Sequence, residues 1–278
     1  METIKFSSYN GDFELSNTSP LTLIAGPCVI EGEDFAIDTA GTLKEIFDSY
    51  GCKWIYKSSF DKANRSSKDS FRGLGIDKGL QILEKVKKTY RVPVITDVHE
   101  KEQVKDVASV VDFLQTPAFL CRQTDFINEV ASANLPVNIK KGQFLSPYEM
   151  KNVLDKAKST GNRNIALCER GTTFGYGNLV VDMKSLTIMK GYNSPVIFDA
   201  THSVQLPGGL GISSGGERQF VSTLAKAATS IGIAGLFLEC HPNPDIAPCD
   251  GPNMLNFEQL RRLLDEILKI DKILKINI

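Results

Sequence analysis

Eight short apolar runs alternate with helix-like segments or long polar loops along most of the chain, and this rhythm limits the possible folds more than any other feature. The runs cover residues 21–25, 53–56, 94–96, 113–115, 137–139, 165–168, 196–198 and 236–238. Runs that are apolar on both faces are typical of parallel strands covered by helices. Eight such units in about 250 residues predict an α/β fold, the (β/α)₈ or TIM barrel.

Helical spacing supports this interpretation. Leucine, isoleucine and valine recur at intervals of three or four residues over 76–90 and again over 257–273. A doubly wound sheet would also alternate strands and helices, but no GxGxxG motif opens a helix here, and polar residues follow every strand. Residues 4–15 carry Asn10-Gly11 between two short runs, which predicts a β-hairpin that caps the bottom of the barrel. We expect residues 1–278 to form one domain.

Composition excludes several partners. The net charge of −1 over 278 residues offers no global field for nucleic acid or an acidic membrane surface. No apolar run reaches the roughly 18 residues of a transmembrane helix. The N-terminus METIKFSSYN lacks the pattern of a signal peptide. The six cysteines form no CxxC pairs, so we expect free thiols and a cytoplasmic location.

Cations cluster where the predicted strands end. In a barrel of this kind the chemistry belongs at the carboxyl ends of the strands. Charges on that half-enclosed rim are costly to desolvate unless an anion compensates them. Arginine binds phosphate through two parallel hydrogen bonds, and lysine binds it as a point charge. This pattern favours a phosphate-binding rim over a structural network of ion pairs. The cations are Lys57, Lys62, Arg65, Arg122, Lys140, Lys141 and Arg170.

Four potential metal ligands follow strands that become neighbours when a barrel closes. Thiolate, imidazole and carboxylate groups suit a divalent first-row ion. Each group also has a structural interpretation: Cys28 as a small apolar residue, a histidine in an ordinary hydrogen bond, the carboxylates as helix caps. His99, His241 and Cys249 are competing ligands, and Cys28 could instead be a nucleophile, although no activating histidine is evident. The four candidates are Cys28, His202, Glu239 and Asp250.

Six segments together resemble the 3-deoxy-D-manno-octulosonate 8-phosphate synthase family. They are KSSFDKANRSS (57–67), ITDVHE (95–100), PAFLCRQTD (117–125), NIKKGQF (138–144), FGYGNLVVDM (174–183) and SPVIFDATH (194–202). The resemblance runs from residue 23 to about residue 255, and the set of motifs is highly specific. The sister family, the 3-deoxy-D-arabino-heptulosonate 7-phosphate synthases, typically has a Lys-Pro-Arg-Thr segment where this chain has KANRSS.

The resemblance implies the condensation of phosphoenolpyruvate with D-arabinose 5-phosphate, in a homotetramer that serves lipopolysaccharide inner-core synthesis. The sister synthase, a Schiff-base aldolase and a noncatalytic phosphosugar-binding barrel remain the alternatives. For phosphoenolpyruvate, the matching residues are Lys62, Lys140, Arg170 and the backbone of Ala118. For the pentose phosphate, they are Asn64, Arg65 and Ser66, with Arg122 from a neighbouring subunit. Lys57 and Asp97 match residues that line the reaction centre. The expected catalytic residues are Lys57, Lys62, Asp97 and His202.

The resemblance also bears on the metal. Metal-dependent members carry cysteine after the first strand, and metal-independent members carry asparagine. Gly26-Pro27-Cys28 therefore implies a divalent ion such as Zn, Fe, Mn or Co, held by Cys28, His202, Glu239 and Asp250. The CDGP segment at 249–252 occurs in both groups and does not discriminate between them. Finally, five glycines between residues 203 and 216 suggest a loop that closes over the site.

Overall fold

Eight parallel strands close into a barrel in the computed structural model, which describes residues 2–9, 11–65, 67–208 and 215–275. Each of the eight predicted runs matches a strand to within one residue at either end. Hydrogen bonds join each strand to the next one along the chain, and the last strand, β14, pairs with the first, β3, to close the barrel. The strands are β3 (Thr22–Gly26), β4 (Lys53–Lys57), β5 (Val94–Asp97), β6 (Phe113–Thr116), β7 (Val137–Lys140), β8 (Ile165–Glu169), β11 (Val196–Asp199) and β14 (Gly235–Glu239).

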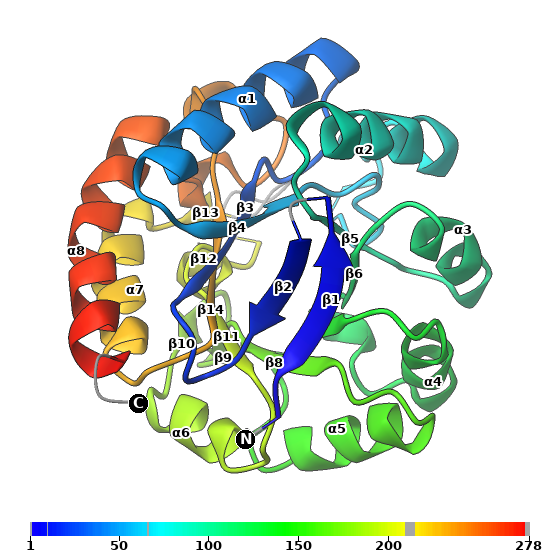
Figure 1. Ribbon diagram of the computed structural model, residues 1–278, viewed down its shortest axis with the longest axis vertical. Coiled ribbons are helices and arrows are strands. Elements are labelled where there is room, and N and C mark those ends of the chain that lie inside the picture. The colour runs from blue at the N-terminus through cyan, green and yellow to red at the C-terminus, as the bar shows by residue number, and fades with distance from the viewer. Residues whose placement is uncertain (1, 10, 66, 209–214, 276–278) are drawn as a thin grey trace.

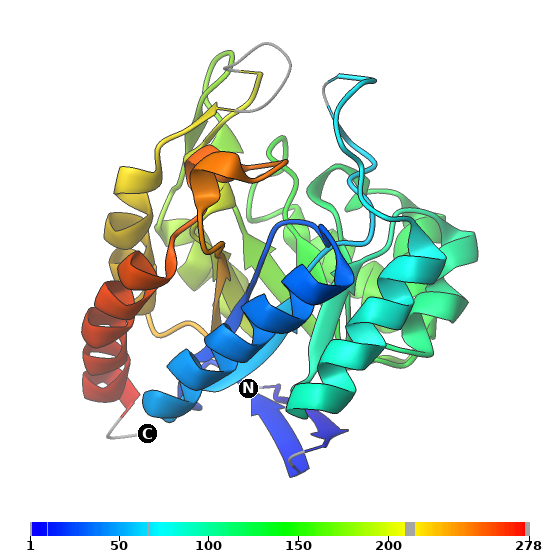
Figure 2. The same ribbon diagram turned by 90° about the horizontal axis from the view of Figure 1, so that it is seen from above.

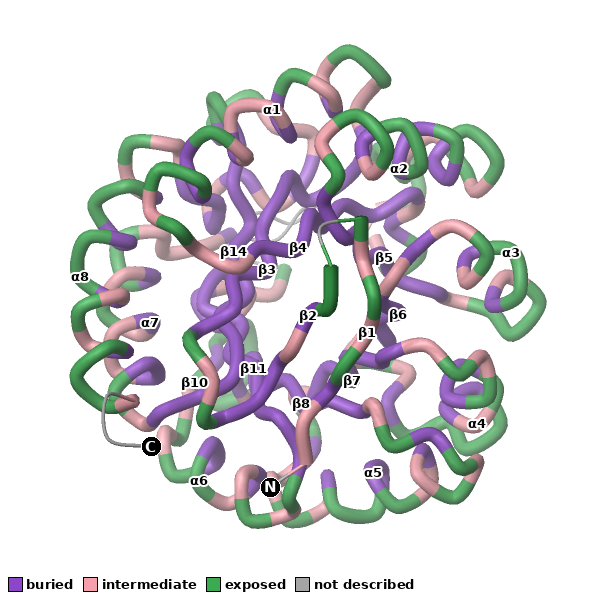
Figure 3. Tube along the Cα trace, in the orientation of Figure 1, coloured by how far each residue is buried: buried purple, intermediate pink, exposed green. Residues whose placement is uncertain are grey.

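A ring of helices surrounds the barrel, and its outer face is exposed while the strands are buried (Figures 1 and 3). The predicted helix 76–90 matches α2, and the predicted helix 257–273 matches α8 except for the last two residues of α8. Leu260, Leu263, Leu264 and Ile267 are the buried stripe of α8, each worth about 1.5–3 kcal/mol when removed from water. The helices are α1 (Glu33–Ser49), α2 (Ile76–Tyr90), α3 (Val104–Ala108), α4 (Thr124–Ser132), α5 (Met150–Ser159), α6 (Lys184–Lys190), α7 (Val221–Thr229) and α8 (Phe257–Lys275).

The predicted hairpin closes one end of the barrel, as Figures 1 and 2 show. Strands β1 (Ile4–Ser8) and β2 (Gly11–Leu15) pair antiparallel. Ile4, Phe13 and Leu15 are buried with the residues that fill the barrel interior, among them Phe113 and Phe237. Asn10 of the predicted turn lies outside the described residues. The apolar plug formed by the hairpin leaves the opposite end of the barrel for polar chemistry.

The strand-to-helix connections gather at that opposite end (Figure 2). Two short antiparallel ladders stiffen them: β9 (Thr172–Thr173) pairs with β10 (Leu179–Val180), and β12 (Gln205–Leu206) pairs with β13 (Gly215–Gly216). Residues 209–214, the middle of the predicted closing loop, lie outside the described residues. The short 3₁₀ helices of this chain are η1 (Lys101–Gln103), η2 (Ala118–Leu120), η3 (His202–Val204), η4 (Arg218–Phe220), η5 (Pro244–Ile246) and η6 (Gly251–Asn253).

Candidate active site

A cavity of about 420 Å³ opens at the carboxyl ends of the strands, where the sequence predicts the site. Most of the predicted site residues line it: Lys57, Lys62, Asn64, Arg65, Asp97, Ala118, Lys140, Arg170, His202 and Asp250. Cys28 and Glu239 are buried beside it. Ser66 lies outside the described residues.

Several of these side chains come from the last residue of a strand. Each observed barrel strand continues one residue past the predicted apolar run, and that residue is polar in most of them. Lys57, Asp97, Lys140, Asp199 and Glu239 all occupy such terminal positions. Because the strands are parallel, their carboxyl ends meet at one rim, so residues far apart in sequence come together.

The buried lysines of the rim are already paired with carboxylates. Lys57 Nζ lies 3.2 Å from Glu239 Oε1, and Lys62 Nζ lies 3.8 Å from the same oxygen. Lys140 forms an ion pair with Asp199 and lies over the ring of Phe237, 3.5 Å from its centroid. Lys57, Lys62 and Lys140 therefore form buried ion pairs, which was the structural alternative to a phosphate-binding rim.

Arg170 and Arg65 differ from these lysines. Arg170 is almost fully buried, and burial lowers the pKa of its guanidinium. Its Nη1, like Nε of Arg65, is a buried donor that has no hydrogen-bond partner among the described residues. An unmatched buried donor costs about 1–3 kcal/mol, and more when it carries charge. Both arginines line the cavity, so an anion bound there would satisfy them.

Lys141 does not belong to the anion-binding rim, in contrast to the prediction for it. Lys140 is the last residue of β7 and lines the cavity, whereas Lys141, the next residue along the chain, does not line it. Lys141 is fully buried, lies 3.4 Å from Glu169 Oε1, and donates to the carbonyl oxygens of Leu145 and Gly171. Glu169 in turn accepts from the backbone N–H of Arg170. Lys141 thus supports the loop that carries Arg170.

Asp97 is held ionised at the rim between β5 and β6. It accepts hydrogen bonds from Ser59 and Gln115. Burial would raise the pKa of Asp97, but the charges of Lys57, Lys62 and His99 outweigh burial and bring the pKa well below its usual range. The carboxylate is therefore a fixed negative charge beside the cations of the cavity.

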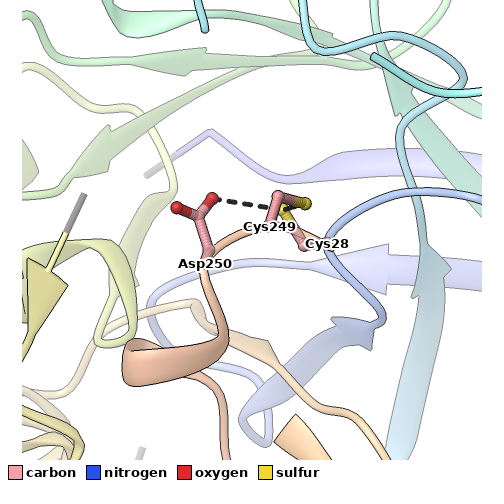
Figure 4. Close-up of side chains that lie close together, drawn as sticks. All are labelled: Cys28, Cys249 and Asp250. Atoms are coloured by element: carbon pink, nitrogen blue, oxygen red, sulfur yellow. Dashed lines mark hydrogen bonds between the residues drawn. The ribbon is translucent and has the colours of Figure 1, made fainter. Parts of the chain in front are cut away.

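The four predicted metal ligands come together in two overlapping groups that share Asp250. His202, Glu239 and Asp250 form one group, and Cys28, Cys249 and Asp250 form the other, with ligand atoms within 4.8 Å of one another in each. Figure 4 shows the second group: Cys28 from the end of β3 and the other two from the loop after β14. Cys28 Sγ lies 3.1 Å from Asp250 Oδ2 and 2.7 Å from Cys249 Sγ.

Local backbone features place these ligands. A Cβ on Gly26 would lie 2.0 Å from the carbonyl oxygen of Lys57, so only glycine lets the end of β3 approach β4 this closely. Asp250 has φ of 52°, in the left-handed region that few non-glycine residues adopt, and such positions concentrate at functional sites.

The chemistry of this donor set fits a divalent ion. Burial raises the pKa of the Cys28 thiol well above its usual value, and Cys249 and Asp250 add to the effect. Glu239 Oε2 is a buried oxygen with no partner in the described part of the chain. A cation would satisfy this oxygen and displace the thiol proton. Of the competing ligands, His241 pairs with Glu31 at 2.9 Å, and His99 packs against Phe60.

Gln205 is a site residue that the sequence analysis missed. It lines the cavity and joins two loops, since its side-chain amide forms hydrogen bonds with both Arg170 and Asp250.

Arg122 lies outside the cavity, with a side chain that is 64% exposed and 3.9 Å from Glu149. It lines a second, neighbouring depression together with His99 and Glu100. All six cysteines are free thiols, as expected.

The fold and the rim define a class: a (β/α)₈ barrel with a cavity lined by lysine and arginine side chains beside a group of potential metal ligands. A family model described as the DAHP synthetase I family matches residues 7–275. The curated relatives include proteins named 2-dehydro-3-deoxyphosphooctonate aldolase. The one from Francisella tularensis subsp. novicida is 61% identical, over 95% of this chain and 96% of its own length.

Two further relatives carry the same name. The protein from Dichelobacter nodosus is 60% identical over 96% of both chains, and the one from Magnetococcus marinus is 62% identical over 93% of this chain and 90% of its own. The chain therefore belongs to the DAHP synthetase I family, and within it to the group of the 2-dehydro-3-deoxyphosphooctonate aldolases. This result confirms the resemblance found in the six sequence segments.

Proposed function

We propose that this protein condenses phosphoenolpyruvate with D-arabinose 5-phosphate to give 3-deoxy-D-manno-octulosonate 8-phosphate and inorganic phosphate. The observation that carries the proposal is the pair of cavity-lining arginines, Arg65 and Arg170, each with a buried unpaired donor. Two separate anion-binding groups suit two phosphorylated substrates. The relatives' shared name, 2-dehydro-3-deoxyphosphooctonate aldolase, supports the identity of the product.

Phosphoenolpyruvate would bind on the side of β7 and β8. Lys140 ends β7 and Arg170 directly follows β8, while Lys62 approaches from the loop after β4. The backbone at Ala118 begins η2 on the same cavity wall. Lys140 can exchange part of its contact with Asp199 for the substrate, and Arg170 offers its free Nη1 to the anion.

Arabinose 5-phosphate would bind at the loop that carries Asn64, Arg65 and Ser66. Asn64 and Arg65 line the cavity. Arg122 is exposed and lines the second depression instead of this cavity, which suits a role in the site of a neighbouring subunit within a homotetramer. Two phosphate groups at opposite ends of one cavity would bring the pentose aldehyde toward the enol carbon.

The reaction joins C3 of phosphoenolpyruvate to the aldehyde carbon of the open-chain sugar. Water adds at C2, and phosphate leaves by cleavage of the C–O bond, so one water is consumed for each phosphate released. Lys57, Asp97 and His202 surround the region between the two anion sites. These side chains would hold the reactants in attack geometry, which supplies about 7–11 kcal/mol of the barrier in favourable cases.

We further propose that a divalent ion binds to Cys28, His202, Glu239 and Asp250. When bound, such an ion supplies Lewis-acid chemistry or orients a water molecule. The unpartnered Oε2 of Glu239 and the clustering of the four ligands support this assignment.

Among the described residues, no helix combines the length and apolar character needed to cross a membrane. Free thiols support action in the cytoplasm, in lipopolysaccharide inner-core synthesis.

Phosphate release with a panel of aldose phosphates tests the proposal. We expect release with phosphoenolpyruvate plus arabinose 5-phosphate, weak release with erythrose 4-phosphate, and loss of activity in a chelator. Preference for erythrose 4-phosphate would instead assign the sister reaction. No release with any sugar would indicate a binding protein. Trapping of a covalent adduct by borohydride would indicate Schiff-base chemistry through a lysine.

A further inference from the structure

Gln205 occupies a position between the two halves of the candidate site. It is the first residue of β12 and pairs with Gly216 of β13, so its backbone is tied into a ladder. A Cβ on Gly216 would meet the side chain of Asn253 at 1.5 Å, which shows how closely this ladder packs on the loop that follows Asp250. The Gln205 side chain is half-buried and lines the cavity.

The two ends of the Gln205 amide contact groups of opposite charge. Oε1 accepts a hydrogen bond of 2.6 Å from Nη2 of Arg170, and Nε2 donates one of 3.0 Å to Oδ1 of Asp250. An amide has an acceptor at one end and a donor at the other, so it matches a guanidinium and a carboxylate at once. A carboxylate or an amine at this position could satisfy only one of the two.

The groups at the two ends belong to different subsites. Asp250 uses its other oxygen, Oδ2, toward Cys28, and the same oxygen lies 3.9 Å from Nε2 of His202. Arg170 keeps Nη1 unpaired among the described residues, ready for an anion. One side chain therefore connects the potential metal ligands to a cation of the phosphoenolpyruvate site.

We propose that Gln205 is a positioning residue that couples the binding of a divalent ion to the binding of phosphoenolpyruvate. This inference rests on the proposed function. An Asp250 carboxylate fixed by a bound cation orients the Gln205 amide, and the amide then holds the guanidinium of Arg170 in place for the substrate. Because coupling of two binding equilibria is reciprocal, phosphoenolpyruvate strengthens ion binding by the same factor.

Calorimetric titration of phosphoenolpyruvate, without sugar, tests the coupling in the absence of turnover. Each protein is titrated after stripping with chelator and again in saturating Mn²⁺. We expect Mn²⁺ to tighten phosphoenolpyruvate binding about fivefold or more in the wild type. Gln205→Met keeps the length of the side chain and removes both hydrogen bonds, so the effect of Mn²⁺ should shrink to about twofold or less.

Gln219→Met is the matched control, since Gln219 is an exposed glutamine on η4 that does not line the cavity. It should keep the wild-type coupling. Gln205→Asn retains the amide but is one methylene too short to reach both partners, so it should lose the coupling as well. It also serves as the test if Gln205→Met fails to fold, which a thermal unfolding scan would reveal.

Three results would overturn the inference: Mn²⁺ has no effect on phosphoenolpyruvate affinity in the wild type, the Gln205 variants keep the wild-type coupling, or they lose affinity equally with and without Mn²⁺. The last result would describe a simple substrate contact. Failure of the proposed function is distinguishable, because it would appear as wild-type protein that binds phosphoenolpyruvate but forms no product with arabinose 5-phosphate.

Discussion

Nδ1 of His202 lies 2.8 Å from Oδ2 of Asp199, while Nε2 of the same ring lies 3.6 Å from Glu239 Oε1 and 3.9 Å from Asp250 Oδ2. Asp199 also accepts from the backbone N–H of His202 and pairs with Lys140. Burial would raise the pKa of Asp199, but His202 and Lys140 lower it well below the usual range. An ionised carboxylate behind a histidine fixes its tautomer and orientation for metal binding.

Asp199→Asn should therefore weaken Mn²⁺ binding about 10- to 100-fold, the usual effect of removing a carboxylate that orients a ligating histidine. Calorimetric or fluorescence titration of the chelator-stripped protein measures the affinity directly. Asp245→Asn changes an exposed carboxylate outside the cavity and should leave the affinity unchanged. Unaltered Mn²⁺ affinity in Asp199→Asn would show that His202 does not depend on Asp199, or does not bind the ion.

Arg65→Ala should weaken arabinose 5-phosphate binding far more than phosphoenolpyruvate binding. Loss of a charge-assisted hydrogen bond costs about 1.5–3 kcal/mol, which corresponds to roughly 10- to 150-fold in affinity. Separate Michaelis constants for the two substrates make the comparison. Arg72→Ala is the control, because Arg72 pairs with Asp61 and does not line the cavity. Equal losses for both substrates would contradict the assignment of Arg65.

Lys141→Met should destabilise the fold. Glu169 and two loop carbonyl oxygens would lose their buried cation, and breaking a buried pair in this way costs about 3–5 kcal/mol. Urea unfolding gives the free energy of unfolding. Lys151→Met removes an exposed lysine paired with Asp155, and its cost should stay below about 1 kcal/mol. Similar costs for the two variants would argue against a supporting role for Lys141.

Asp97 should contribute stability that disappears in acid. Its pKa is lowered in the folded protein from about 3.9 in an unfolded chain. The folded state therefore favours the ionised form, and the gain is present above pH 4 and lost as the pH falls through the folded-state pKa. The difference in unfolding free energy between wild type and Asp97→Asn should be larger at pH 7 than at pH 3. A difference that grows on acidification would contradict this account.

Cys28→Asn should abolish Mn²⁺ or Co²⁺ binding while keeping some activity that a chelator does not affect. The resemblance to metal-independent members, which carry asparagine here, motivates this expectation. In the wild type, Co²⁺ should give a thiolate-to-metal absorption band that the variant lacks. Cys52→Ala, away from the cavity, should retain the band. Full activity of metal-free wild type in chelator would make Cys28 a spectator.

Much of this architecture could be predicted from the sequence because apolar runs and helical spacing are local signals. All eight barrel strands and helix α2 follow from them. The polar residues at the strand ends also predicted most of the side chains that line the cavity. The prediction for Lys141 was wrong because adjacent lysines look alike in a sequence, although only Lys140 lines the cavity and Lys141 binds Glu169 and loop carbonyl oxygens.

Gln205 could not be found in this way. A glutamine signals no particular chemistry by its type, and its partners lie 35 and 45 residues away along the chain. Only the closure of the barrel, which sets the loops after β8, β11 and β14 side by side, brings Arg170, Gln205 and Asp250 into contact. The resemblance to a family supplied the substrate identities that no spacing could provide.

The most direct test follows the aldehyde carbon. Unlabelled phosphoenolpyruvate and arabinose 5-phosphate carrying ¹³C at its aldehyde carbon, C1, are incubated with the protein. Phosphate release and the ¹³C NMR spectrum are measured on the same samples. We expect one phosphate for each labelled carbon that becomes bonded to C3 of phosphoenolpyruvate, in an eight-carbon sugar acid phosphate. Phosphate release while the label stays in unreacted arabinose 5-phosphate would contradict this expectation.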